Sequence, residues 1–416
     1  MTTEISATGS HATPRKKVAR LWWHVHQWAG LKLSILLSFV LLTGTLATIS
    51  HEIDWLIDPA IRVAPSSVTG PPDWAAISAT AAAYPRTAKI ESIDGPTGPG
   101  FAASVTITDV DGARRFLWIH PSSGALQGDS TWYNVARILR DLHRRLNISA
   151  WWGITLVSAL AILLAVSLAT SLVVYKCWWR GFFKPIRWRD ARTAWGDAHR
   201  LAGLWSLAFL LVITLTGIWY LVESLGGEAP RLPEPAKATT VVTASPSRIA
   251  ETLPVALALV QRHDPGLAIT AIRPPDEKHG AFAFHGQRGA ILVRERANAA
   301  WVSSDGQRLL LTTDGADLSV HQRISEMADP LHFGTMEWGE ANSWWVRWLW
   351  FLFGLALTGL SVSGVAIHMA RIARKTHTPS RVRTALAGMG RWRWPASALV
   401  LTGLALTVGR LITQDM

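Results

Sequence analysis

The chain has a single cysteine, Cys177, in 416 residues. One cysteine excludes an internal disulfide and any cysteine-ligated iron–sulfur cluster or zinc ribbon, because each of these needs at least two thiols. Charged residues are also scarce, at 17% of the chain, whereas apolar residues make up 49%. This balance is low in charge for a soluble enzyme and typical of a bundle of membrane helices.

Several motifs of catalysis and nucleotide binding are missing. No Gly-x-Gly-x-x-Gly follows an expected strand and no Walker loop occurs, so the chain carries no nucleotide-binding domain of its own. The Gly-rich segment 95–100 contains too much proline to cradle a phosphate. No Ser/His/Asp or His-Glu-x-x-His arrangement indicates hydrolysis.

Acidic residues are few enough to leave a net charge of +12. The basic residues gather in short segments beside apolar runs, which is the distribution that membrane orientation requires, so we expect membrane lipid and no nucleic acid as a partner. The 23 tryptophans fit this interpretation, because many of them stand at the ends of apolar runs, where indole sits well among lipid headgroups.

Five apolar runs reach the length of about 20 residues that a membrane-spanning helix needs. We expect the transmembrane segments at 21–50, 144–175, 199–222, 344–370 and 395–412. The last is the shortest. The first run is too long for the core of a signal peptide and lacks a cleavage site of small residues, so it reads as an uncleaved anchor.

Short basic segments fix the expected orientation. The tail 1–20 and the loops 176–198 and 371–394 are rich in Lys and Arg, which places them in the cytoplasm by the positive-inside rule. The long segments 51–143 and 223–343 then lie on the outer side of the membrane, and the chain is a multi-pass membrane protein. With five spans, the C-terminus is also expected outside.

Each long outer segment has the pattern of a small α+β domain. In the first, Asp73–Tyr84 predicts a helix, and Phe101–Ile107 and Arg114–His120 predict strands. The second repeats this order, with a helix expected at Ser247–Arg262 and strands at Ala281–His285, Ala290–Arg294 and Ala300–Ser303.

An internal repeat runs through the whole pattern. The segment His26-Gln27-Trp28-Ala29-Gly30-Leu31 returns as His199-Arg200-Leu201-Ala202-Gly203-Leu204, and Thr43-Gly44 returns at the same offset as Thr216-Gly217. Each copy opens an apolar run. The chain therefore reads as a duplication that retained a histidine at the mouth of the first helix of each half.

Taken together, these pieces resemble the PepSY-associated transmembrane proteins of bacterial iron uptake. The matching motifs in chain order are 22–31, Glu52-Ile53-Asp54 with Asp58-Pro59, Leu142-His143-Arg144, Asp197-Ala198-His199-Arg200 and Leu331-His332-Phe333-Gly334. The resemblance implies a membrane α-helical bundle of about five spans in duplicated helix pairs, with two α+β periplasmic PepSY-like modules. Some members are thought to be haem-containing reductases of ferric siderophores.

Four histidines occupy equivalent places in the two halves. His26 and His199 begin the first helix of each half, and His143 and His332 precede the second. Two pairs at opposite membrane faces predict two haems b, each with two histidine ligands, an arrangement that suits electron transfer. The glycine four residues after His26 and after His199 leaves room for a porphyrin edge. The alternative is that all four are interfacial residues bonded to headgroups or backbone.

Two further histidines are candidate ligands. His51 has no counterpart in the other half, and His368 lies near the cytoplasmic end of the fourth span, where it competes with His199 or His26 for the iron or binds a haem propionate. His24 reads as an interfacial neighbour. Three arginines of the second outer segment, Arg294, Arg296 and Arg323, are candidates for attracting an anionic ferric chelate, against the alternative of a solvated charged surface.

The favoured hypothesis is an inner-membrane dihaem oxidoreductase, a ferric-siderophore reductase that releases Fe²⁺ for iron uptake. Because no nucleotide domain is built in, a separate donor must supply the electrons: a reduced flavin, a reductase or a membrane quinol. The alternative is a non-enzymatic PepSY membrane protein that binds a partner or modulates a peptidase. A transporter is the third reading; the parallel orientation of the two halves counts against it.

Overall fold

The computed structural model describes residues 14–236, 244–335, 343–376 and 382–414. The chain divides into two compact units. The first comprises residues 1–39, 159–214 and 356–400, and the second residues 40–158, 215–355 and 401–416. The first unit contains both basic loops, and the second contains both of the long segments between spans.

Helices make up the first unit. Its complete helices are α1 (Pro14–Leu31), α7 (Leu160–Val174), α8 (Ala191–Trp205) and α14 (Val382–Met389). Four other helices are divided between the two units: α2 (Ser34–Ala47), α9 (Leu207–Ser224), α13 (Trp344–Thr376) and α15 (Arg393–Gln414).

The first expected span is not one straight helix. It breaks between α1 and α2, which meet at an angle of 64°. The break contains Lys32, whose Nζ donates to the carbonyl oxygen of Gly388 at 3.1 Å. A lysine in an apolar run is costly unless it finds such an acceptor. The third expected span is interrupted as well, at Ser206 between α8 and α9. The two interruptions fall at the same place in the two copies of the repeat.

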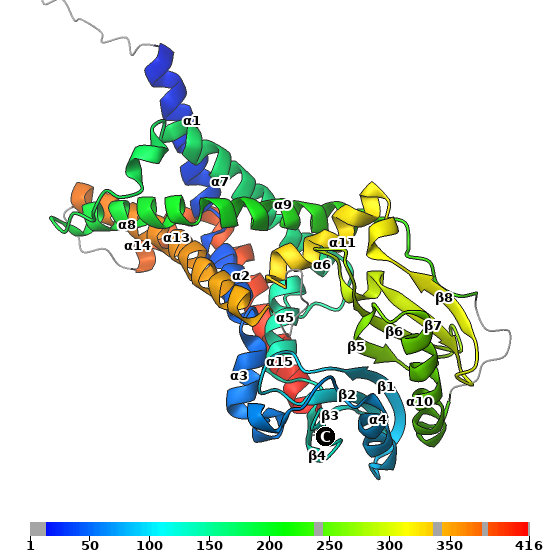
Figure 1. Ribbon diagram of the computed structural model, residues 1–416. Coiled ribbons are helices and arrows are strands. Elements are labelled where there is room, and N and C mark those ends of the chain that lie inside the picture. Colours follow the sequence, from blue (N-terminus) through cyan, green and yellow to red (C-terminus); the bar gives the residue numbers. More distant parts are fainter. Residues whose placement is uncertain (1–13, 237–243, 336–342, 377–381, 415–416) are drawn as a thin grey trace, which may run out of the picture. The chain divides into compact units, whose positions relative to one another are not determined.

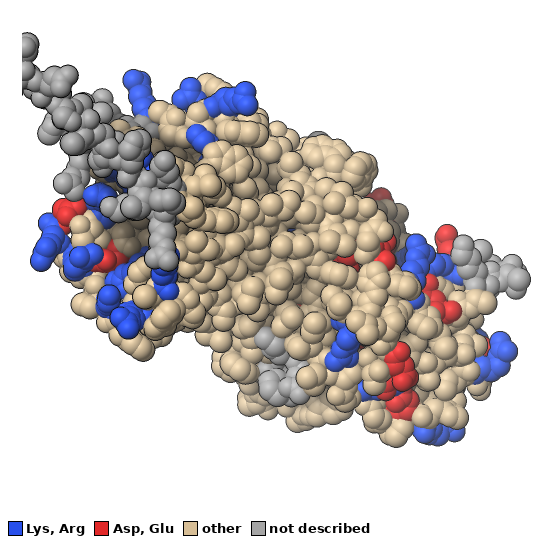
Figure 2. Space-filling model, turned by 90° about the horizontal axis from the view of Figure 1, so that it is seen from above, with Lys and Arg blue, Asp and Glu red and all other residues tan. Residues whose placement is uncertain are grey.

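Within the described residues, four helical segments are long and apolar enough to cross a membrane, and the bent pair of α1 and α2 makes a fifth if it counts as one span. The last of the four, Ala385–Thr413, is longer than the sequence alone indicated. Only 17% to 22% of each span's most apolar window is buried, so these helices expose apolar side chains that water would not tolerate. In Figure 2, broad surfaces carry no charged side chain at all. The chain is a multi-pass membrane protein.

An eight-stranded antiparallel sheet lies in the second unit (Figure 1). Its first half is β1 (Thr87–Asp94), β2 (Ala103–Asp109), β3 (Arg114–Ile119) and β4 (Leu126–Thr131). Its second half is β5 (Ala268–Arg273), β6 (Ala281–Gln287), β7 (Ala299–Ser303) and β8 (Leu309–Thr313). The order β4-β3-β2-β1-β5-β6-β7-β8 joins two equivalent meanders at β1 and β5, where Ile93 faces Ile272.

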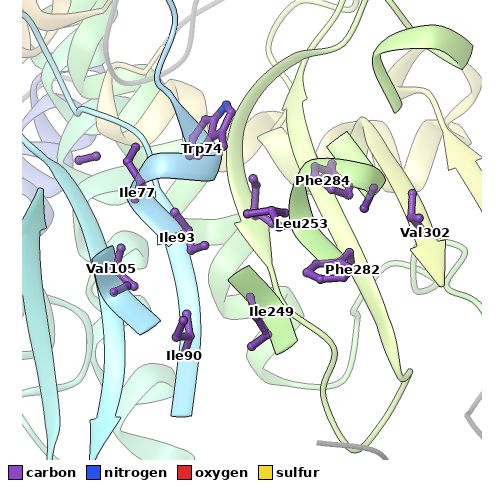
Figure 3. Packing of buried hydrophobic residues seen from close by; sticks show 14 of the residues in the cluster. Trp74, Ile77, Ile90, Ile93, Val105, Ile249, Leu253, Phe282, Phe284 and Val302 are labelled. Carbon is purple, nitrogen blue, oxygen red and sulfur yellow. The ribbon is translucent and has the colours of Figure 1, made fainter. Parts of the chain in front are cut away.

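One helix from each half packs on this sheet. They are α4 (Trp74–Ala83) and α10 (Pro246–His263), and both predicted outer helices are thereby confirmed. A single core joins the halves, because Ile77 of α4, Leu253 of α10 and Phe284 of β6 belong to one buried cluster (Figure 3). The two expected modules therefore share one sheet and one core.

One predicted strand is wrong. Residues 290–294 form an irregular segment, because Leu292 has a φ of 53°, which lies outside the extended region, and the neighbouring Ile291 is exposed. The strands expected at Phe101–Ile107, Arg114–His120, Ala281–His285 and Ala300–Ser303 correspond to β2, β3, β6 and β7.

Three more helices of the second unit carry or flank the remaining histidines. They are α3 (Ser50–Ile57), α5 (Val135–Arg145) and α11 (Val320–Phe333). α5 begins at Asn134, whose side chain accepts from the Arg137 amide, and it ends at Leu146 in a left-handed conformation. Ser319 and Gln322 form a capping box at the start of α11.

Candidate functional site

His26 and His199 lie together in the first unit. They come from α1 and α8, and their ring centroids are 6.4 Å apart with the ring planes at 82°. The Nδ1 atom of His26 donates to the carbonyl oxygen of Ser167 at 3.2 Å and lies 3.0 Å from the Thr170 hydroxyl, both on α7. The Nδ1 atom of His199 lies 2.8 Å from the Ser363 hydroxyl on α13.

His143 and His332 form the corresponding pair in the second unit. They come from α5 and α11, with ring centroids 6.0 Å apart. The Nδ1 atom of His143 donates to the Val40 carbonyl on α2 at 2.9 Å. That of His332 lies 2.8 Å from the Thr216 hydroxyl on α9. The sequence repeat is thus repeated in space: in each half, the two histidines bond to equivalent helices.

The hydrogen bonds at Nδ1 determine which nitrogen is free to bind a metal. A carbonyl oxygen only accepts, so His26 and His143 carry their proton on Nδ1. The Ser363 hydroxyl donates to the Leu360 carbonyl and accordingly accepts from His199. In each of these rings Nε2 keeps its lone pair, and a partner on the far nitrogen orients the ring as metal-bound histidines require.

The separation of the rings fits a metal ion between them. A metal–imidazole bond is about 2 Å long and the nitrogen lies about 1.1 Å from its ring centre, so imidazoles on opposite sides of one ion have centres about 6.2 Å apart. The observed separations are 6.4 Å and 6.0 Å. Both pairs therefore have the spacing of axial ligands.

The donor set suits haem better than a bare ion. No group of three or more His, Cys, Asp or Glu side chains within the described ranges could hold a metal ion. Two histidines are too few for a zinc site, which takes three or four protein ligands. A porphyrin supplies the equatorial nitrogens itself, so two axial histidines complete its iron.

Burial keeps the second pair neutral. It lowers the pKa of His143 and lowers that of His332 to about 3, to which the neighbouring His143 adds a smaller effect. Neutral imidazoles bind metal without first losing a proton. The ring of Tyr220 lies edge-on to His332, and its hydroxyl donates to Asp329 at 2.7 Å.

The repeated Thr-Gly pairs lie beside this second pair. A Cβ on Gly44 would be 2.5 Å from the imidazole of His143, so only glycine fits there. In the other half Thr216 bonds to His332. The glycines after the first pair differ from this: a Cβ on Gly30 would meet nothing within 4 Å, and one on Gly203 would lie 3.6 Å from the Leu360 side chain, an ordinary contact. The porphyrin edge expected at both glycines stays a prediction.

The two other candidate ligands are not paired with a second histidine. His51 lies on α3, and no ring contact or hydrogen bond joins it to another histidine within the described segments. His368 on α13 accepts at Nδ1 from the Gln27 amide, at 3.1 Å. His24 is exposed and packs edge-on against Trp23. The assignment of His51 and His368 as haem ligands stays a prediction without geometric support.

The arginines expected to attract a chelate are already engaged. Arg294 pairs with Glu326 and Asp329, and Arg296 pairs with Glu326. Arg323 bonds to backbone carbonyls of Gly315 and Ile291.

A different set of arginines was missed from the sequence. Arg137, Arg140 and Arg144 follow one another at helical spacing along α5, next to His143, and none of them forms an ion pair within the described residues. Arg137 stacks on Trp132 with its guanidinium carbon 3.8 Å from the ring centre. The spacing of three and four was visible in the sequence and could have revealed this basic face.

A known family matches this chain along most of its length. The family model described as the PepSY-associated TM region matches residues 23–371, which is most of the chain. An uncharacterized protein of Pseudomonas aeruginosa is 26% identical over 294 residues, covering 66% of this chain and 74% of that protein. The chain therefore belongs to the PepSY-associated transmembrane family.

Proposed function

We propose that this protein is a dihaem oxidoreductase of the bacterial inner membrane that passes electrons to a periplasmic ferric siderophore. The observation that carries the proposal is the occurrence of two histidine pairs, each with the ring separation of axial haem ligands. His26 and His199 would hold one haem b, and His143 and His332 the other. When bound, each haem would supply an iron that takes up and releases one electron.

The residues of the chain hold the ligands rather than perform chemistry on a substrate. Ser167, Ser363 and Val40 accept from Nδ1 of three histidines, which leaves the Nε2 lone pair of each free to bind an iron. Two histidines on one haem iron would leave it no free position for oxygen. This arrangement supports electron transfer and disfavours oxygenation.

Direction follows from the basic loops. The positive-inside rule assigns the loops of the first unit to the cytoplasm, so electrons would enter at His26 and His199 from a reduced flavin, a reductase or quinol. The sheet belongs to the second unit together with His143 and His332. The second pair would therefore serve the periplasmic substrate.

The basic face of α5 supports an anionic substrate. Arg140 and Arg144 are exposed, and Arg137, Arg140 and Arg144 have no carboxylate partner within the described residues. Unpaired guanidinium groups raise the local concentration of anions, and added salt weakens this effect. An anionic ferric chelate would be drawn to the turn of helix that carries His143. Reduction weakens such a chelate, because its hard oxygen donors prefer Fe³⁺ to Fe²⁺.

The test is reoxidation of the dithionite-reduced protein by a ferric siderophore, followed by stopped flow. We expect the wild type to reoxidise quickly, and the His332→Ala variant to lose this reaction while its cytoplasmic haem remains reducible. Equal rates in the two proteins would remove the second pair from the mechanism. A fully folded protein without a Soret band would return the function to a non-enzymatic binding role.

A further inference from the structure

A pocket of about 400 Å³ opens in the first unit between α1 and α13. Its polar and aromatic lining comes from four residues of α1 and two of α13: Arg20, Trp23, His24, Gln27, His368 and Arg371. The α1 residues are spaced by three or four, so they form one face of that helix. The volume lies within the range of small-molecule sites.

The pocket is positively charged and lacks a counter-charge. Neither Arg20 nor Arg371 forms an ion pair with a carboxylate within the described ranges, and no acidic residue lines the pocket. The Arg371 guanidinium lies over the Trp23 ring, 4.3 Å from its centre. The charges of Arg371 and Lys32 also act on His368. Clustered cations without a counter-charge favour an anion as a partner.

The His368 ring forms one wall of the pocket. The Gln27 amide donates to its Nδ1 atom at 3.1 Å and holds the ring in place. The Nε2 atom is buried on the other side, because a Cβ on Gly388 of α14 would lie 2.5 Å from it. His368 therefore shapes the pocket and does not donate into it.

The pocket lies close to the first histidine pair. Gln27 directly follows His26 in α1, and His368 lies one helical turn after Gly364, where a Cβ would be 3.8 Å from the His199 ring. Residues that line the pocket thus lie next to His26 in α1 and one helical turn from the residue of α13 that borders His199.

We propose that this pocket is an oxyanion site for a carboxylate or phosphate group carried on a flat, largely apolar ligand. Arg20 and Arg371 bind the anion, and Trp23 contacts the apolar part. Two sources share this chemistry: the carboxylates of the haem assigned to His26 and His199, and the phosphate of flavin mononucleotide as an electron donor. The first source rests on the proposed function; the second does not.

The experiment compares the full-length protein with the double variant Arg20→Gln/Arg371→Gln. The matched control is Arg180→Gln/Arg189→Gln, which removes two exposed cations of the same unit outside the pocket. Binding of flavin mononucleotide and of inorganic phosphate is measured by calorimetry in neutral detergent. The midpoint potential of each haem is measured by spectroelectrochemistry.

A phosphate ligand predicts at least a tenfold loss of flavin mononucleotide affinity in the double variant and no loss in the control. If the pocket instead binds haem carboxylates, the double variant should shift the redox equilibrium of one haem tenfold toward the oxidised form. This lowers its midpoint potential by about 59 mV for a one-electron couple. If the double variant keeps both the wild-type affinity for flavin mononucleotide and the wild-type haem potentials, the pocket is not an oxyanion site. If the wild type contains no haem but binds flavin mononucleotide, and the double variant loses that binding, the proposed function is refuted and the anion site in the pocket is supported.

Discussion

Imidazole binds a metal through a nitrogen that carries no proton, and a hydrogen bond at the other nitrogen decides which one that is. In this chain His26, His143 and His199 each have Nδ1 tied to an acceptor on a neighbouring helix. The sequence predicted which histidines would pair, because the repeat returned them in register. It did not predict their partners Ser167, Val40 and Ser363, since these lie on helices distant in the chain. Ligation itself stays a prediction.

The Ser363 hydroxyl gives a test at this scale. We expect Ser363→Ala to weaken haem binding at His199 by about 10-fold to 100-fold, the usual effect of losing a partner of a metal-bound histidine. Ser361→Ala is the control, because its hydroxyl bonds to Ser38 on α2 and to no histidine. Haem retained per protein after a chase with apomyoglobin measures the effect. Equal retention in both variants would show that Ser363 does not orient a ligand.

Gly44 gives a second test. A Cβ there would lie 2.5 Å from the His143 ring, and close packing leaves no slack for it. Gly44→Ala should displace the imidazole and remove the haem of the second pair, leaving that of the first. Gly359→Ala on α13 is the control, because its Cβ would meet nothing within 4 Å. The measurement is the haem-to-protein ratio, and a full complement of haem in Gly44→Ala would contradict the placement of His143.

Helices and strands were predictable where one pattern ran without interruption. The outer helices α4 and α10 are clear examples, since an apolar stretch and a capping residue mark each of them. The breaks at Lys32 and Ser206 were not predictable, because apolar composition continues across both and only tertiary contacts such as Lys32 to Gly388 favour the bend. β1 was missed for a related reason: its register shifts between Ile90 and Ser92, so the buried Ile90 and Ile93 are three residues apart and break the alternation of a strand that is central in the sheet.

Two arginines hold the loop before α8: Arg200 bonds to the carbonyls of Gly181 and Lys184, and Arg187 pairs with Asp197. Arg187 bonds to Asp197 through its backbone amide and its guanidinium, and its side chain is the main reason why the pKa of Asp197 falls to about 2. We expect Asp197→Asn to lower stability by about 1–3 kcal/mol at pH 7, seen as a lower melting temperature in detergent.

The sign of the pH dependence follows from the direction of this shift. Because the folded pKa lies below the unfolded value of 3.8, the contribution is complete above pH 3.8 and is lost as pH falls toward about 2. The difference in melting temperature between wild type and Asp197→Asn should therefore shrink over that window. A difference that stays constant down to pH 2 would mean that the ion pair does not form.

At the scale of the whole molecule, duplication accounts for both the paired histidines and the joined sheet. The two meanders meet where Ile93 pairs with Ile272, and both side chains are fully buried. The sequence indicated two modules but could not show that they share a sheet, because strand pairing between β1 and β5 leaves no local pattern.

The shared sheet predicts cooperative unfolding of the two halves. Ile93→Ala should cost about 2–5 kcal/mol, as for other large core truncations, and should lower the protease resistance of both halves together. Leu310→Ala on β8 is the control, because Leu310 is exposed. Limited proteolysis with mass spectrometry measures each half separately. Loss of protection in the first half alone would show that the modules are independent.

The central claim is that two histidine pairs hold two haems, and the most direct test is a count. Haem per protein is measured by pyridine haemochromogen assay on the wild type, His199→Ala, His332→Ala and the double variant. The control is His263→Ala, an exposed residue at the end of α10. The account predicts two haems in the wild type and in the control, one in each single variant and none in the double variant. A wild type without haem, or single variants that both retain two, would contradict it.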